Sequence, residues 1–330
     1  MSCIRALIRG LVAFGFALSV VDAAATSSVD AATANAARQR LLALDPAHVS
    51  ASDVRDVLAQ APAPRIILIQ GSVAFVNMEP FAEFLVAMGY PAERLKDPDG
   101  TISRTSFGSS TELAGTLAWY YEREGMVPLL IGHSQGGMLV MRTLHELNGE
   151  FGESIPVWDP LSRAALPRTS IVDPRTGAER PVVGLRVPYA AAIATGKLMR
   201  VFLGQWTMLP LLRKVPDTVD DFTGFTLEWD PIAGSFPGAE PYVATGSAHV
   251  RNVTLPASYH HIELPNAAPL AANRVTREWI DHYTPGEDVA TAPAEARDAA
   301  NLLHAADIWY SIKKHWCLEA QRLALPRGGA

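Results

Sequence analysis

The stretch LLIGHSQGG, residues 129–137, constrains the fold more than any other part of the chain. An apolar run precedes it, a helical pattern follows it, and Ser134 stands between Gly132 and Gly136. In a Gly-x-Ser-x-Gly turn between a strand and a helix, the serine takes strained backbone angles, and a side chain at either glycine would collide with a neighbouring element. The hydroxyl then stands clear of the sheet, beside a helix N-terminus. This context indicates an activated serine.

Strand-like and helix-like segments alternate around this turn. Short apolar runs at 66–69 and 127–131, bounded by proline or glycine, predict buried strands. The patterns at 79–90, 111–125 and 136–147 predict helices, and Gly125 is a typical C-terminal stop. This alternation predicts an α/β fold with a mostly parallel central sheet and helices on both faces.

Later segments continue the pattern to the end of the chain. The runs at 187–193, 224–229 and 251–257 predict strands, and those at 275–284 and 294–316 predict helices. A further helix is expected over 50–60, beginning with a capping serine and aspartate.

Two segments interrupt the alternation. Residues 148–186 contain Thr176-Gly177, a pair suited to the turn of a small β-hairpin. Residues 195–223 carry many large apolar side chains and are broken by two prolines. A long connection with its own apolar surface is typical of a lid over a site, although an ordinary helical excursion fits the pattern equally well.

The N-terminus has the layout of a secretory signal peptide. Arg5 and Arg9 precede an apolar run that is shorter than the roughly 20 residues of a membrane span. Small residues follow, so we expect a signal peptide over 1–25 and an α/β domain over 26–330. The alternative is an uncleaved N-terminal anchor. No later stretch suits a membrane span, and the expected location is the periplasm or the exterior of a bacterium.

Charge and cysteine content narrow the function further. Cleavage would move the formal charge from −6 to −7, because the removed segment holds Arg5, Arg9 and Asp22. No block of lysines or arginines remains to bind a nucleic acid backbone. Cys317 would be the one cysteine left, so an exported protein would fold without an internal disulfide.

On the Gly-His-Ser-Gln-Gly-Gly elbow, the chain resembles the α/β-hydrolase family, and more narrowly its lipase-like and esterase-like members. The resemblance covers roughly residues 64–285 and implies that Ser134 is the nucleophile of a catalytic triad. In that family the acid and the histidine follow the serine in chain order, each after a later strand. A serine hydroxyl needs such a base, and the base needs a carboxylate to hold its tautomer.

Two adjacent histidines, His260 and His261, follow the last predicted strand and are the candidate bases. Members of the family often carry an apolar residue three positions after the catalytic histidine. His261 has Leu264 at that position, whereas His260 has Glu263. The resemblance therefore favours His261, with His260 as the second choice.

The candidate acid is Asp230, at the end of the predicted strand over 224–229. Asp230 and Pro231 resemble the acid loop of the family, although Asp-Pro also begins ordinary turns. Asp220 and Asp221 are alternative candidates for the acid, but no predicted strand ends directly before them.

The resemblance also implies an oxyanion hole made of backbone N–H groups. One donor would be Gln135, and the other Ser72 in the turn after the first strand, with Val73 as a further possibility. Members of the family usually have His-Gly in this turn, where this chain has Gln70-Gly71. The change leaves the backbone donor in place.

These features predict an exported serine hydrolase that cleaves a small, moderately hydrophobic carboxylic ester through an acyl-enzyme, without a cofactor or a metal. Thr195-Gly196 lacks the Pro-His that lipase-like relatives place between these residues, so a true triacylglycerol lipase is not expected. An acyltransferase or thioesterase would use the same triad. A non-catalytic binding protein on the same fold is a third hypothesis.

Overall fold

The computed structural model describes residues 33–73, 75–197, 201, 203–234, 240–287, 289–297 and 299–325. The chain divides into two compact units, residues 1–43 and 44–330. In the first unit, residues 33–42 are helical. The predicted signal peptide lies outside the described residues, as do residues 198–200 and 202 of the predicted lid-like segment.

The second unit contains a six-stranded sheet in which every pair of neighbours is parallel. Its strands are β1 (Ile66–Ile69), β2 (Ser103–Arg104), β3 (Leu129–His133), β8 (Val187–Ile193), β10 (Val219–Leu227) and β12 (His249–Leu255). They lie in the order β12-β10-β8-β3-β1-β2. Every residue of β1, β3 and β8 is buried, as expected for strands covered on both faces. The predicted α/β fold with a parallel central sheet is confirmed.

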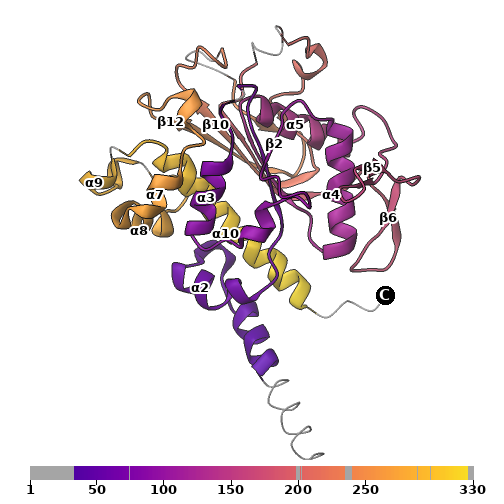
Figure 1. The fold of residues 1–330 in the computed structure, drawn as a ribbon, viewed down its shortest axis with the longest axis horizontal. Helices are drawn as coiled ribbons and strands as arrows, with labels where there is room; N and C mark the ends of the chain where they lie inside the picture. The colour runs from indigo at the N-terminus through magenta and orange to yellow at the C-terminus, as the bar shows by residue number, and fades with distance from the viewer. Residues whose placement is uncertain are drawn as a thin grey trace, which may run out of the picture. The chain divides into compact units, whose positions relative to one another are not determined.

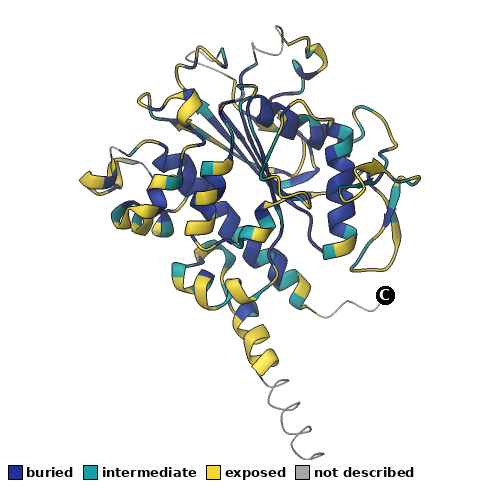
Figure 2. Ribbon diagram, viewed as in Figure 1, coloured by how far each residue is buried: buried dark blue, intermediate teal, exposed yellow. Residues whose placement is uncertain are grey.

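Helices cover both faces of the sheet. Figure 1 shows α4 (Ser110–Glu124) and α5 (Gln135–Leu147) on one side, and α3 (Glu79–Ala87) and α10 (Leu302–Ala324) on the other. The buried residues of these helices face the sheet in Figure 2. Gly125 ends α4 in the left-handed region, with φ +74°, as the sequence predicts.

Shorter helices complete the unit: α2 (Ala51–Asp56), α7 (Ala268–Ala272), α8 (Arg274–His282) and α9 (Ala294–Arg297). Ser50 and Asp53 form a reciprocal capping box at the start of α2. Within the described residues, no helix combines the length and the apolar character needed to cross a membrane.

The bounds of several predicted elements differ from the structure, and two of the differences have a physical explanation. Strand β10 begins at Val219 instead of residue 224, because Asp221 is buried in the sheet against Lys314 and His315 of α10. A buried charge is tolerated when it is paired, so this part of the strand has no apolar pattern. The helix predicted over 294–316 is divided into α9 and α10, and Asn301 precedes α10 with φ +70°.

Short strands lie in or next to the two segments, 148–186 and 195–223, that interrupt the predicted alternation. Between 148 and 186, β4 (Trp158–Asp159) pairs with β5 (Ala164–Ala165), and β6 (Ser170–Val172) pairs with β7 (Glu179–Pro181), both antiparallel. Gly177 lies in the β6–β7 turn with φ +72°. In the second segment, β9 (Lys214–Val215) pairs with β11 (Val243–Ala244). Residues 219–223 belong to β10, so the lid-like segment is shorter than the sequence suggests.

Candidate active site

The candidate site lies at the carboxyl edge of the sheet, where the chain changes direction. From β1 the chain crosses to β2 on one side, and then to β3 on the other side of β1. Ligands of open α/β sheets bind at such a switch point. Gly71 follows β1 and Ser134 follows β3, so the two predicted halves of the nucleophile and oxyanion machinery meet at this point.

Ser134 has a strained backbone, with φ +54° and ψ −115°. A non-glycine residue in such a region persists only when its surroundings hold it there. Its N–H donates to the carbonyl of Ile193 at 2.7 Å. Its own carbonyl accepts a hydrogen bond from Thr195 Oγ1 at 2.9 Å. The end of β8 and the residues after it therefore fix the serine from the neighbouring strand.

The glycines around Ser134 are required by close approaches of the backbone. A Cβ on Gly132 would collide with the backbone of Gly136, and a Cβ on Gly136 would collide with the carbonyl of Ile69. A Cβ on Gly71 would lie 3.1 Å from Ser134 Cβ. The turn after β1 thus packs directly against the serine.

His261 and Asp230 form a buried pair beside this turn. His261 follows β12, and its Nδ1 lies 2.6 Å from Asp230 Oδ2. A carboxylate only accepts hydrogen bonds, so Nδ1 carries the hydrogen and Nε2 is the basic nitrogen. The other oxygen of Asp230 accepts from Ala233 N–H at 2.9 Å, which fixes the carboxylate. His260 is exposed and makes no contact with Asp230.

His133 connects the elbow to the candidate base. Its Nε2 donates to the carbonyl of His261 at 2.9 Å, and the two rings lie 4.9 Å apart. Burial, followed by the nearby charge of His261, lowers the pKa of His133 to about 3, so this ring stays neutral. Ser134 Oγ makes no hydrogen bond to a described residue, and such bonds often tighten when substrate binds. The structure thus joins Asp230 to His261, and His261 to His133 of the serine turn, while a bond between Ser134 and His261 stays a prediction.

The turn after β1 is anchored to the edge strand. Gln70 N–H donates to the carbonyl of Arg104 at 2.9 Å, and Ser106 Oγ donates to the carbonyl of Gly71 at 3.2 Å. Ser72 is exposed and makes no hydrogen bond within the described part of the chain. Its N–H is therefore suited to the oxyanion role. The carbonyl of Val73 accepts from Val76 within the same turn.

The second predicted oxyanion donor, Gln135, is the first residue of α5. Its backbone N–H lies at the N-terminus of that helix, where negative charge is stabilised.

The competing aspartates have other partners. Asp220 pairs with Arg186 at 2.8 Å, and Asp221 is held by Lys314 and His315 within the sheet. Neither contacts His260 or His261. Among the described residues, no group of three or more His, Cys, Asp or Glu side chains could hold a metal ion.

Two residues that contact the serine turn or the candidate base, His133 and Thr195, were not predicted from the sequence. His133 occupies the variable position of the Gly-x-Ser-x-Gly pattern, so the motif alone gives it no role. Thr195 stands out in the sequence only as part of an incomplete family segment, whereas in the structure it holds the backbone of Ser134.

Comparisons with known proteins give little information about the chemistry of this site. No family model matches the chain, and no curated protein matches it. The solved structure of RedJ with a PEG molecule bound in the active site has a TM-score of 0.28 and 17% identity, covering 65% of this chain and 89% of that one. RedJ thioesterase from the prodiginine pathway of Streptomyces coelicolor also has a TM-score of 0.28 and 17% identity, covering 66% and 89%. Likeness at this level does not bear on chemistry, so the function must be inferred from the site.

Proposed function

We propose that the protein is an exported serine hydrolase that cleaves carboxylic esters with a moderately hydrophobic acyl or alcohol part. One observation carries this proposal: a strained serine elbow lies beside a buried Asp–His pair whose basic nitrogen is left for proton transfer. Strained backbone at a non-glycine residue is concentrated at functional sites.

The reaction follows from the roles of these groups. Ser134 Oγ attacks the ester carbonyl while His261 Nε2 takes its proton, and Asp230 stabilises the imidazolium that forms. The N–H groups of Gln135 and Ser72 hold the oxyanion. His261 then gives the proton to the leaving oxygen, and the alcohol departs. Water activated by the same histidine attacks the acyl-enzyme and releases the acid.

The preference for a hydrophobic ester is supported by side chains around the site. Phe75 follows β1, Phe107 follows β2, Trp229 adjoins Asp230 and Ile262 adjoins His261, and all four are exposed. Exposed large apolar side chains next to candidate site residues in the chain favour an apolar ligand. We therefore expect affinity to rise with the length of the acyl chain.

The test is a series of p-nitrophenyl esters of increasing acyl length, assayed with wild type, Ser134→Ala and Ser52→Ala. Ser52 lies in α2 and is exposed, so its replacement is the matched control. We expect Ser134→Ala to lose turnover by about a millionfold, as in a well-studied serine protease, and Ser52→Ala to match wild type. No turnover at any length would refute the esterase. Faster cleavage of acyl thioesters, or transfer to an added alcohol, would assign the same site to a thioesterase or an acyltransferase.

Export is tested separately by the intact mass of protein recovered outside the cytoplasm. Loss of about the first 25 residues is expected for a cleaved signal peptide. A full-length mass would favour the uncleaved anchor, and would leave the chemistry of the site unaffected.

A further inference from the structure

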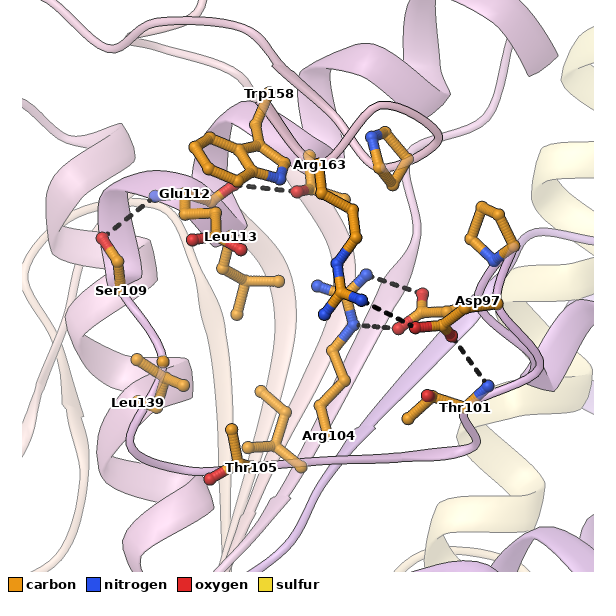
Figure 3. A pocket seen from close by; sticks show the side chains of 16 residues that line it. Asp97, Thr101, Arg104, Thr105, Ser109, Glu112, Leu113, Leu139, Trp158 and Arg163 are labelled. Atoms are coloured by element: carbon orange, nitrogen blue, oxygen red, sulfur yellow. Dashed lines mark hydrogen bonds and ion pairs between the residues drawn. The ribbon is translucent and has the colours of Figure 1, made fainter. Parts of the chain in front are cut away.

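A cavity of about 220 Å³ opens between β2, the N-terminal turns of α4 and the β4–β5 hairpin (Figure 3). Its apolar lining comes from Ile69, Leu113 and Leu139. The lining does not include Ser134, Asp230 or His261. It is smaller than the 300–1,000 Å³ or so of drug-sized pockets, so it suits a small ligand.

Four of the charged groups around this cavity neutralise one another. Arg104 makes two hydrogen bonds of 2.6 Å to Asp97, and this pair is mostly buried. Arg163 lies 3.8 Å from Asp99, and its side chain is 77% exposed. The first pair is a tight bidentate contact, and the second is a loose surface contact of little energetic value.

The fifth charged group, Glu112, has no such partner. It lies in the first turn of α4, where its N–H donates to the capping Ser109 Oγ at 3.2 Å. Its carboxylate does not return to the cap, and it makes no hydrogen bond or ion pair with any residue the structure describes. The side chain is half-buried and lines the cavity. Among the described residues no side chain pairs with this carboxylate, and only the partial positive charge of the α4 N-terminus offsets it.

Trp158 lies on the same side of the cavity as Glu112 (Figure 3). Gly115, one helical turn after Glu112, allows Trp158 to lie in this position. A Cβ at Gly115 would lie 2.8 Å from the backbone nitrogen of Trp158 and 3.2 Å from its Cβ. The glycine thus admits β4 against the helix and places an indole beside the unpaired carboxylate.

The geometry points to a binding site for a small organic cation, a primary ammonium on a short apolar chain. Its ammonium group would pair with Glu112 and lie against the indole of Trp158, where a cation is attracted to the ring. Its chain would cover Ile69, Leu113 and Leu139. An anion would be repelled by the unpaired carboxylate, and a neutral molecule would gain no ion pair with it.

The site adjoins the turn that follows β1. Arg104, in the cavity wall, accepts the N–H of Gln70 through its carbonyl, and Ser106, next to the lining residue Thr105, bonds to Gly71. The wall of the cavity is therefore joined to the proposed oxyanion turn by these two hydrogen bonds. The binding site itself does not depend on the proposed hydrolase activity.

The test is calorimetric titration of the full chain with n-butylammonium, 1-butanol and butyrate, which share a chain length and differ in charge. Saturable binding is expected for butylammonium, and binding weaker by about tenfold or more for the other two. Glu112→Gln should weaken butylammonium binding by about tenfold. Glu79→Gln, an exposed glutamate in the first turn of α3, should leave it unchanged.

Arg163→Gln separates a cation site from an anion site. Removing this positive charge should tighten butylammonium binding, because Asp99 loses its partner and the cavity becomes more negative. Preference for butyrate, with binding lost in Arg163→Gln, would overturn the proposal, as would equal binding of butanol or no saturable binding of butylammonium. Because binding is measured directly, an inactive Ser134→Ala protein serves equally well, and failure here leaves the esterase test untouched.

Discussion

Two buried aspartate–histidine pairs lie in the described part of the chain, and they differ in their neighbours. Asp230 Oδ2 is 2.6 Å from His261 Nδ1 at the carboxyl edge of the sheet. Asp221 Oδ2 is 2.8 Å from His315 Nε2, between β10 and α10. By distance and burial alone the two pairs are nearly equivalent.

Their surroundings separate them. The first pair adjoins a strained serine, through the contact of His133 with His261. The second has Lys314 Nζ at 2.5 Å from the same aspartate, and the ring of Tyr189 stacked on the histidine at 5.6 Å. Burial raises the pKa of Asp221, but hydrogen bonds from His315 and Lys314 outweigh it and hold the pKa well below the usual range. The two pairs therefore differ in their neighbours: the serine turn lies next to one, and a lysine is bound to the other.

The largest effect expected from this comparison is in Asp230→Asn. The amide cannot hold the tautomer of His261, so kcat for p-nitrophenyl ester hydrolysis should fall by about 10⁴-fold. The matched control is Asp221→Asn, assayed well below its melting temperature, which should keep its kcat. An Asp221→Asn enzyme as inactive as Asp230→Asn would contradict the division of roles.

The free energy of unfolding should fall more in Asp221→Asn than in Asp230→Asn. Asp221→Asn leaves the half-buried Lys314 without its counter-charge and the buried His315 without its carboxylate partner, and breaking a buried ion pair costs about 3–5 kcal/mol. Urea unfolding at pH 7 would measure this loss of stability. Asp230→Asn should lose less, because it leaves no cation unpaired. Equal losses would mean that the second pair has no special structural role.

His304 is also buried, and it forms no ion pair with a carboxylate of the described residues. Its Nε2 donates to the carbonyl of Leu264 at 2.8 Å, and burial lowers its pKa to about 4. The unfolded chain, with an ordinary histidine pKa near 6.5, binds the proton more readily, so stability should fall as pH drops from 6.5 towards 4.

Between pH 7 and pH 5, His304 should account for about 2 kcal/mol of the decrease in the free energy of unfolding. His304→Gln keeps a donor for Leu264 and removes the titration, so its decrease over the same range should be smaller by that amount. Denaturant unfolding of both proteins at the two pH values is the measurement. Parallel decreases would show that His304 does not titrate in this range.

The smallest effect is expected at His260. Its side chain is exposed and has no contact with Asp230, so His260→Ala should change kcat by no more than about twofold, as for a typical surface substitution. His261→Ala in the same assay should abolish turnover. A large loss in both variants would indicate that His260 contacts the substrate.

The parts of this structure that were predicted from the sequence depend on local patterns. The strands β1 and β8 and the first part of β3 are apolar runs. Gly132 and Gly136 lie beside Ser134 in the chain, in a motif that requires glycine at both positions. Asp230 and His261, which the resemblance implied as acid and base, are hydrogen-bonded to each other, and their roles in catalysis stay predictions.

Features that depend on distant contacts could not be predicted. Residues 219–223 look polar and loop-like until α10 supplies Lys314 and His315 to Asp221. The cavity beside Glu112 requires β4 to pack on α4 at Gly115, a contact that spans more than forty positions between Gly115 and Trp158. Neither contact leaves a pattern in the neighbouring sequence.

The order of the strands has a consequence for how the protein folds. The serine follows β3, the aspartate follows β10 and the histidine follows β12, and β8 lies between the first two. Contacts between such distant segments form slowly, because long loops must close before they are made. During refolding, helical circular dichroism should therefore return before any ester is cleaved, and recovered activity would be a reporter for the docking of the last strand.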